Sequence, residues 1–337
     1  MPVPCLTTAL TGPLKDLETR ILSAQPQIEH WFRSQWTQYT PPFYGSVDLR
    51  NSGFKLAPVD MNLFPGGFNN LSSDFLPLAV QATQSALEKI CPEARSVLLV
   101  PENHTRNTFY LRNVAALKQI LELAGLKVRL GSLSPDITAP TVLELGDGET
   151  LTVEPIVRHG HRISLGDDFN PCVVLLNNDL SAGVPDILRN VDQAVLPPLH
   201  GGWAVRRKSN HFAAYDQVAS EFAELIGIDP WFINPLFNGC KGLDFHQRQG
   251  EEALAEVVDQ MLGKIASKYR EHKIDAKPFV IVKADAGTYG MGIMSVKDAR
   301  DVIGLNRKQR NKMAVIKEGQ EVSEVIVQEG VYTFEQV

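Results

Sequence analysis

The sequence has few cysteines and no closely spaced pair of them. Cys5, Cys91, Cys172 and Cys240 lie far apart, which argues against a disulfide framework or a zinc site and favours the reduced thiols of a cytoplasmic protein. No apolar run approaches the roughly 18 residues that a membrane span requires. The first residues also lack the basic and apolar segments of a signal peptide. The sequence therefore predicts a cytoplasmic protein without a membrane partner.

Basic charge is scarce as well. The 337 residues carry a formal net charge of −6, whereas a general nucleic-acid-binding protein has a surplus of lysine and arginine. A basic stretch occurs at 307–312, but in an acidic chain it is better interpreted as the solvated face of a helix. The composition otherwise matches a globular protein of one to three domains. We therefore expect small-molecule partners and no nucleic acid.

The middle of the chain alternates between helical and strand patterns. Apolar residues recur at helical spacing in two segments, and three short apolar runs are typical of buried strands. The predicted helices are 76–90 and 114–124, and the predicted strands are 96–100, 126–130 and 173–176. This order predicts a parallel α/β layer, in which ligands bind beyond the carboxyl ends of the strands. Two polar clusters, 102–107 and 177–179, follow such strand ends.

The flanking regions have different patterns. The first 40 residues are expected to be helical with a break at Pro26, and residues 44–70, rich in Gly, Pro, Asn and Asp, to form an irregular binding loop. In the C-terminal part, helices are predicted at 208–226, 254–269 and 306–317, and strands at 278–283, 293–296 and 325–329. We expect three parts, namely an N-terminal helix and substrate-loop region at 1–75, an α/β domain at 76–200 and a further domain at 201–337.

The segment around Lys283 bears the clearest functional signal. An apolar strand delivers this lysine to a loop that contains Gly287, Gly290 and Gly292. Glycines let backbone N–H groups approach phosphate oxygens, and the lysine adds a positive charge, so the segment is suited to the phosphates of a nucleotide. Its spacing fits neither a P-loop nor a Rossmann fingerprint. The alternative is a β-hairpin whose turn happens to be rich in glycine.

Residues 45–70 contain side chains suited to an amino-acid substrate. Arg50 and Lys55 can hold an α-carboxylate, and Asp48 and Asp60 can hold an α-ammonium group. The candidate substrate-binding residues are Asp48, Arg50, Asn51, Lys55, Asp60, Asn69 and Asn70, with Arg106 as a further candidate after the first strand. The alternative is a surface loop held by Asx-turns and by ion pairs among its own residues.

Other groups are weaker candidates. His159 and His161 could meet a metal ion, but no third ligand with suitable spacing is near, so a solvated loop is the better interpretation. His200 is expected in a hinge, and Cys172 in core packing. We assign no metal ligand in this chain.

Motifs at both ends of the chain resemble one family. Those in the C-terminal part resemble the first two-thirds of an ATP-grasp domain; they are Lys208 before a helix that ends at Gly227, Lys283 with its glycine loop, and the strand end Gln328-Glu329-Gly330-Val331. Those at 45–71, 101–107 and 201–208 resemble the ATP-grasp-like glutamate–cysteine ligases of proteobacteria. The likeness extends over essentially the whole chain. It implies an α/β fold, in which an N-terminal parallel α/β, pre-ATP-grasp-like domain is followed by a partial ATP-grasp α+β domain.

The resemblance implies an ATP site in the C-terminal domain. Two lysines would contact the phosphates, the glycine loop would close over them, a strand-to-hinge segment would hydrogen-bond the adenine, and an acidic residue would hold the ribose. The implied ATP-binding residues are Lys208, Lys283, Gly287, Thr288, Tyr289, Gly290, Gly292, Gln328, Glu329, Val331 and Glu335. Lys208, Lys283 and Arg106 would be the catalytic residues.

The resemblance also implies the reaction. The γ-carboxylate of L-glutamate would attack the γ-phosphate of ATP, and the amine of L-cysteine would displace phosphate from the acyl phosphate, giving γ-glutamylcysteine in the first step of glutathione biosynthesis. Mg²⁺ would be required, with its ligands expected beyond residue 337, so this chain alone is expected to be inactive or severely weakened. Two alternatives remain, a truncated or degenerate binding module without catalysis and a ligase with another acceptor amine. A homo-oligomer is compatible with the sequence.

Overall fold

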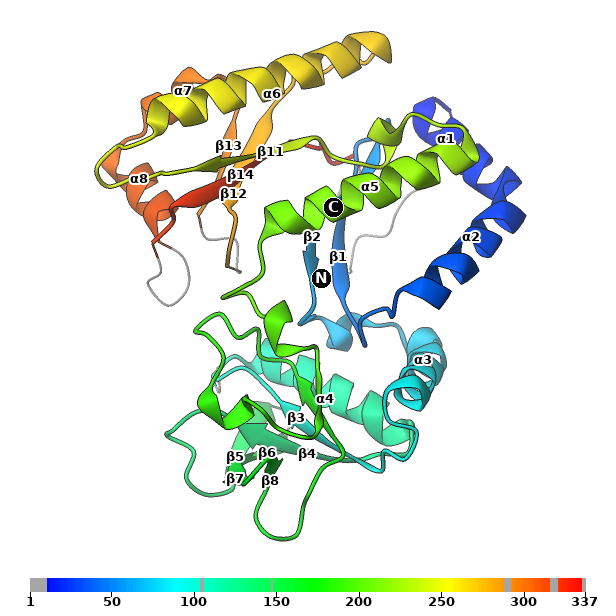
Figure 1. Cartoon of the computed structure of the whole chain (residues 1–337), viewed down its shortest axis with the longest axis vertical. Coiled ribbons are helices and arrows are strands. Elements are labelled where there is room, and N and C mark those ends of the chain that lie inside the picture. The colour runs from blue at the N-terminus through cyan, green and yellow to red at the C-terminus, as the bar shows by residue number, and fades with distance from the viewer. Residues whose placement is uncertain (1–10, 104–105, 147, 288–291, 316–320, 335–337) are drawn as a thin grey trace. The chain divides into compact units, whose positions relative to one another are not determined.

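The chain folds into two compact units. The computed structural model describes residues 11–103, 106–146, 148–287, 292–315 and 321–334 (Figure 1). Unit 1 consists of Met1–Pro41, Val47–Met61 and Trp203–Val337, and unit 2 of Pro42–Ser46 and Asn62–Gly202. This division differs from the three expected segments, because the N-terminal region, 1–75, is shared between the units. Among the described residues, no helix combines the length and apolar character needed to cross a bilayer.

Unit 2 contains a six-stranded sheet with the strand order β10-β9-β3-β4-β6-β5. The first five strands in this order are parallel, and β5 pairs antiparallel with β6 at one edge. The strands are β3 (Ser96–Val100), β4 (Lys127–Ser132), β5 (Thr141–Gly146), β6 (Glu149–Pro155), β9 (Val173–Leu176) and β10 (Ala194–Leu196). The predicted parallel layer is therefore confirmed, although its strands β5, β6 and β10 were not predicted.

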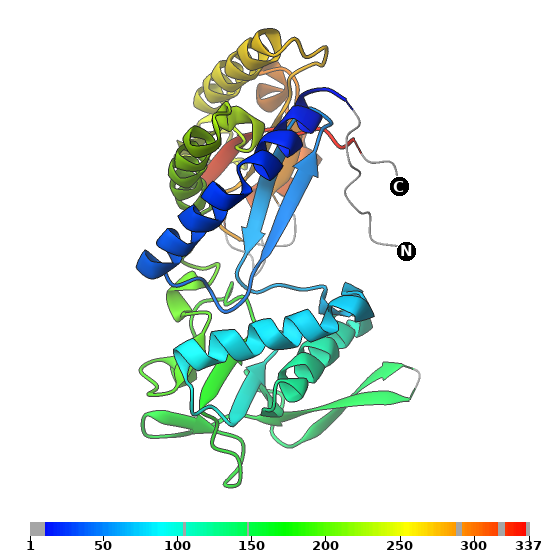
Figure 2. The same ribbon diagram turned by 90° about the vertical axis from the view of Figure 1, so that its right-hand side faces the viewer.

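Two helices cover one face of this sheet. They are α3 (Leu76–Ile90) and α4 (Thr108–Leu123), which lie side by side (Figure 2). Leu87 of α3 and Val114 and Leu121 of α4 pack in one buried cluster with the strand residues Val97 and Leu175. Because these strands are buried on both faces, they appear in the sequence as continuous apolar runs rather than as alternating patterns.

Smaller elements complete unit 2. A two-stranded sheet is formed by β7 (Val157–His159) and β8 (Arg162–Ser164). Short 3₁₀ helices lie at Phe68–Asn70, Ser73–Phe75, Asp186–Leu188 and Leu199–Gly201.

Unit 1 begins with the predicted helices, α1 (Pro13–Ser23) and α2 (Gln25–Gln38), but they are separated at Ala24 and not at Pro26, which lies in the first turn of α2, where proline is tolerated. The expectation of an irregular stretch at 44–70 was wrong over most of its first half, where β1 (Ser46–Asn51) and β2 (Leu56–Asn62) form a hairpin around a short turn. Apolar and polar residues do alternate in β1, as Val47, Asp48 and Leu49 show. The surrounding glycines, prolines and asparagines obscured this period of two.

The main sheet of unit 1 is antiparallel, with the strand order β11-β14-β12-β13. Its strands are β11 (Phe237–Lys241), β12 (Val280–Ala284), β13 (Ile293–Val296) and β14 (Glu324–Glu329). Helix α6 (Glu251–Glu271) covers one face, where its Leu254 and Val258 pack with Val282 of β12 and Val327 of β14. Because side chains alternate along a strand, Lys283 and Gln328 point to the opposite face.

Further helices flank this sheet. They are α5 (Lys208–Ile226), the 3₁₀ helix Pro230–Phe232, α7 (Arg300–Ile303) and α8 (Arg307–Ala314). Helix α5 ends at Gly227, whose φ of 67° is left-handed, as its predicted role at the end of a helix requires. Helix α8 is the predicted basic helix, and a capping box between Asn306 and Gln309 fixes its start.

Candidate active site

The start of α5 is fixed against the end of β12. The backbone N–H of Lys208 donates to the carbonyl of Asp285 at 2.9 Å. The Asp285 carboxylate accepts two hydrogen bonds from Ser209, one from its N–H and one from its hydroxyl, both at 2.7 Å. These bonds satisfy donors of the first helical turn and place Lys208 beside the strand that carries Lys283.

Both lysines are buried, yet their ammonium groups contact neutral partners. Lys208 is 6% exposed, and its Nζ donates to the carbonyl of Gly287 at 2.6 Å and lies 4.2 Å from the ring centre of Trp203. Lys283 is 5% exposed, and its Nζ donates to the carbonyl of Val59 at 2.6 Å. Within the described part of the chain, no carboxylate lies within 4 Å of either Nζ. The two positive charges are therefore only partly compensated.

The electrostatics reflect this incomplete compensation. Burial lowers the pKa of Lys208 to about 8, with Asp60 opposing the shift and Lys283 adding to it. Burial likewise lowers the pKa of Lys283, opposed by Asp60, Asp48 and Asp285. A bound anion would raise both pKa values, so the site favours a negatively charged ligand.

Two further side chains of this region were missed at the sequence level. The Arg206 guanidinium donates to the carbonyl of Met61 at 2.7 Å and lies 4.7 Å from the ring centre of Trp203. Burial lowers the pKa of Arg206, and burial together with the charge of Arg206 lowers the pKa of His211 to about 4. His211 is therefore neutral at pH 7. Arg206 lies in the motif at 201–208 that supports the family resemblance. From that motif, however, the sequence analysis assigned a role in binding only to Lys208.

The β1–β2 hairpin contributes the carboxylates that act on these lysines. Burial raises the pKa of Asp48, and the nearby Asp60 raises it further, whereas Arg50 and Lys283 lower it. Arg50 also donates to the hydroxyl of Thr333 at 2.6 Å. Three of the expected substrate residues, Asp48, Arg50 and Asp60, therefore interact electrostatically in one cluster with Lys283.

Lys55 and Glu329 do not belong to that group. They form an ion pair of 2.7 Å in which each side chain is 1% exposed. Glu329 also accepts hydrogen bonds from the indole N–H of Trp231 at 3.0 Å and from the N–H of Leu236 at 3.0 Å. Asn51 is similarly engaged, since its side chain accepts from the N–H of Gly53 at 2.9 Å. These three side chains hold the local fold, and this geometry does not favour their expected contacts with ligands.

The glycine loop lies in a hairpin between β12 and β13, in which Lys283 is opposite Ile293. Gly287 and Gly292 have φ angles of 88° and 62°, in the region that favours glycine. The antiparallel pairing of β12 with β13 agrees with the alternative interpretation of a β-hairpin, and a hairpin is compatible with phosphate binding. Thr288, Tyr289 and Gly290 of the loop lie outside the described residues, as does Glu335.

Gln328 has an unusual environment. Its side chain is 2% exposed, and its Nε2 has no hydrogen-bond partner among the described residues. On the neighbouring strand it lies opposite Ile281, which lines a cavity of ≈ 920 Å³ together with Ile293, Ser295 and Lys312. Val331 follows β14 after one residue, Gly330. A cavity of this volume is large enough for a nucleotide, although its described lining includes neither Gln328 nor Lys208 and Lys283.

The remaining expected residues belong to unit 2. Asn69, Asn70 and Arg106 all have exposed side chains. Asn69 and Asn70 lie in the 3₁₀ helix Phe68–Asn70, and Arg106 precedes α4.

The two polar clusters at the strand ends of unit 2 bind to each other. The Glu102 carboxylate accepts from the N–H of Asp179 at 2.8 Å, and Tyr110 donates to the side chain of Asn177 at 3.0 Å. Asn177 in turn donates to the carbonyl of Pro65 at 2.8 Å. The sequence indicated their location at one sheet edge, and the structure shows that they connect the loops there.

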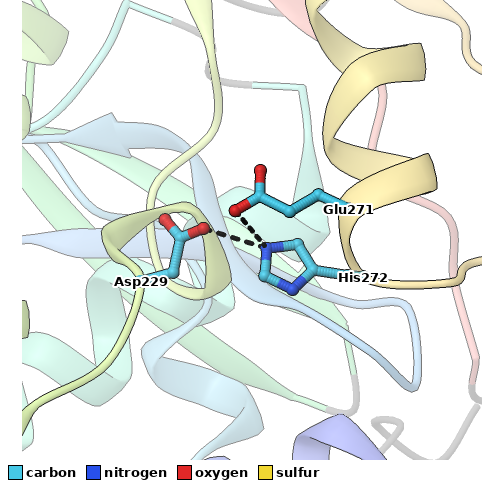
Figure 3. Close-up of side chains that lie close together, drawn as sticks. All are labelled: Asp229, Glu271 and His272. Atoms are coloured by element: carbon cyan, nitrogen blue, oxygen red, sulfur yellow. Dashed lines mark hydrogen bonds and ion pairs between the residues drawn. The ribbon is translucent and has the colours of Figure 1, made fainter.

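The possible metal ligands within the described residues are already engaged by a cation. Asp229, Glu271 and His272 lie close together, with His272 Nε2 2.9 Å from Asp229 (Figure 3). The ammonium of Lys268 lies 2.6 Å from Asp229 and 3.0 Å from Glu271, so it already neutralises this cluster. His161 contacts the carbonyl of Asn190 in an exposed hairpin, which agrees with a solvated loop.

Comparison with known proteins identifies the class and then the family. The model of the family GshA, described as glutamate-cysteine ligase, matches residues 18–337. The protein is therefore an enzyme of the ATP-dependent ligases. The chain belongs to the glutamate-cysteine ligase family, which joins glutamate to cysteine in glutathione synthesis. The comparison with curated protein sequences finds no match.

Solved structures give a consistent result. A crystal structure from Methylobacillus flagellatus KT, described as a "Putative gamma-glutamylcysteine synthetase", is 67% identical with a TM-score of 0.92. The match covers 100% of this chain and 79% of that chain. A D-alanyl-alanine synthetase A from Vibrio cholerae is 11% identical over 71% of this chain and 60% of its own, but its TM-score of 0.39 is too low to support a conclusion.

Proposed function

We propose that unit 1 is a partial ATP-grasp domain that binds the phosphates of ATP between Lys208 and Lys283. The observation that carries this proposal is the arrangement of the two lysines. They come from different elements, both are buried, and among the described residues each ammonium group donates its hydrogen bond to a neutral carbonyl oxygen. A triphosphate supplies the negative charge that these ammonium groups lack.

The face of the sheet that carries Lys283 also supports the placement of the base. Gln328 Nε2 is a buried donor without a partner among the described residues, and an adenine ring nitrogen is a suitable acceptor. Ile281 and Ile293 offer the apolar surface on which a base can lie. The hydrogen bond to adenine is therefore assigned to Gln328 rather than to Glu329.

The hairpin supports the placement of glutamate. Asp48 and Asp60 can hold its α-ammonium group, and Arg50 can hold its α-carboxylate. Because both carboxylates act electrostatically on Lys283, this glutamate would bind next to the phosphate site, within reach of the γ-phosphate.

The chain's residues would then catalyse by positioning and charge compensation. The γ-carboxylate attacks the γ-phosphorus and ADP leaves, while Lys208 and Lys283 stabilise the charge on the phosphoryl oxygens. The amine of cysteine attacks the acyl carbon of γ-glutamyl phosphate, loses its proton, and displaces phosphate. Magnesium, when bound, neutralises phosphate charge in reactions of this kind. No magnesium ligands are assigned among the described residues, because Lys268 occupies the candidate cluster.

Substitution of the lysines tests this proposal. We expect Lys283→Met and Lys208→Met each to weaken ATP binding about tenfold or more, which corresponds to about 1.4 kcal/mol. Isothermal titration calorimetry with ATP measures this directly. Lys277→Met is the matched control, since Lys277 is an exposed lysine just before the same strand. Unchanged ATP affinity in both site variants would contradict the proposal.

A cytoplasmic location also belongs to this proposal. Cys91, Cys172 and Cys240 are free thiols, which supports a reducing compartment.

A further inference from the structure

The β1–β2 hairpin carries the proposed glutamate residues but has little support of its own. Residues 47–50 of β1 are exposed. An isolated two-stranded hairpin is at best marginally stable in water. Other contacts must therefore fix the position of Asp48, Arg50 and Asp60.

The turn of the hairpin enters the aromatic core of unit 1. The ring of Phe54 lies parallel to that of Trp231, with 6.1 Å between their centres, and meets Tyr269 edge-on at 5.6 Å. The next residue, Lys55, places its Nζ 4.3 Å from the ring centre of Trp231 and 2.7 Å from the Glu329 carboxylate. The turn is thus inserted into the core rather than resting on its surface.

Glu329 connects this turn to the strand of the proposed ATP site. Its carboxylate accepts from Lys55, from the indole of Trp231 and from the N–H of Leu236. It directly follows Gln328, the residue proposed for the adenine. The hairpin is also held at its other end, where Lys283 donates to the carbonyl of Val59 at 2.6 Å.

A buried ion pair is a poor means of raising stability, because desolvation offsets much of the attraction between its charges. Apolar residues of similar size would serve at least as well for stability alone. The directional hydrogen bonds around Glu329, in contrast, define one position of the turn relative to β14.

We infer that Lys55, Glu329 and Trp231 form a positioning anchor, which sets the hairpin against the nucleotide-binding sheet and so places the residues that hold glutamate. These are positioning residues and do not touch the substrate. The inference rests on the proposed roles of Asp48, Arg50 and Asp60.

The test compares single and double variants of the enzyme. Lys55→Met and Glu329→Gln each leave one member of the pair without its partner, so both lower the midpoint of thermal unfolding. The variant with both substitutions removes both charges and recovers most of that midpoint. We expect its KM for glutamate to stay about tenfold or more above the wild-type value, while its KM for ATP changes by less than about twofold. Lys241→Met, which breaks the exposed pair with Glu324, is the matched control.

A wild-type KM for glutamate in a stable double variant would overturn the inference, because the pair would then be structural only. If the double variant fails to fold, Trp231→Phe tests the inference instead. This substitution keeps an aromatic ring and removes the indole donor to Glu329. A raised KM for glutamate in Trp231→Phe supports the anchor, and an unchanged KM with a lowered midpoint overturns it. Failure of the ATP site would appear separately, as unchanged ATP affinity in Lys283→Met.

Discussion

Lys283 and Val59 are 224 residues apart, and the ammonium of one donates to the carbonyl oxygen of the other at 2.6 Å. This bond joins the strand of the proposed phosphate site to the hairpin of the proposed glutamate site. An ammonium group has three donors, so Lys283 can keep Val59 and still contact a phosphate oxygen. In the proposed function, the sites of the two substrates of the first reaction step are thus linked by the side chain of Lys283.

Binding of ATP should take up protons at pH 8. The pKa of Lys208 is about 8 in the free protein, so its side chain is deprotonated in about half of the protein molecules at that pH. A bound phosphate favours the charged ammonium and raises this pKa, which draws a proton from solution. Calorimetry in buffers of different ionisation enthalpy measures the uptake. Lys208→Met should remove most of it, and release of protons in the wild-type protein would contradict the assignment.

Asp285→Ala should destabilise unit 1 by about 2 kcal/mol, because two donors of Ser209 lose their acceptor at the start of α5. It should also weaken ATP binding, since Lys208 stands on the turn that Asp285 fixes. Urea denaturation and ATP titration measure the two effects. Asp275→Ala, in an exposed loop, is the control and should change neither. An unaltered unfolding free energy in Asp285→Ala would show that the cap contributes little.

Gly330→Ala should be clearly destabilising. A Cβ at this position would lie 2.1 Å from the ring of Phe279, a distance that forces the ring or the backbone to move. Such overpacking costs about 1–3 kcal/mol. Gly239→Ala in β11 is the matched control, because no atom lies within 4 Å of its Cβ position. Equal unfolding free energies for the two variants would refute the steric argument.

Asn177→Ala should loosen the loop at 62–70 in unit 2. It removes the donor to the carbonyl of Pro65, the acceptor of Asn113 and one of the acceptors of Tyr110, at a cost of about 2–3 kcal/mol. Limited proteolysis should then cut this loop faster. Tyr110→Phe keeps the bond from Asn177 to Pro65 and should have a smaller effect on this loop. Identical cleavage rates in the wild type and Asn177→Ala would disprove this role.

Local patterns in the sequence predicted much of the fold. The helices α3 and α5 and the strands β3, β9 and β13 lie where apolar periodicity placed them, and Gly227 ends α5 as expected. The hairpin β1–β2 was missed because its turn-forming residues conceal a short alternation. Strands such as β10 are only three residues long and acquire their structure from the neighbouring strand.

The candidate site was predictable only in part. A lysine after a buried strand and before glycines indicated Lys283 from local sequence alone. The pairing of Lys55 with Glu329, 274 residues away, left no such signal. Lys55 was interpreted as a substrate contact because its segment is rich in polar residues, and Glu329 as an ATP contact because of the family resemblance. Arg206 and His211 gain their altered pKa values from burial, which a sequence does not display.

The position of β14 in the middle of its sheet sets an order of events during synthesis. Both β11 and β12 must wait for residues 324–329 to emerge from the ribosome before they can pair with it. The turn that carries Lys55 waits equally long for Glu329. The parallel sheet of unit 2, in contrast, is complete once residue 196 has been made. The sheet of unit 2 can therefore form before the sheet of unit 1, whose strand β14 has not yet been synthesised.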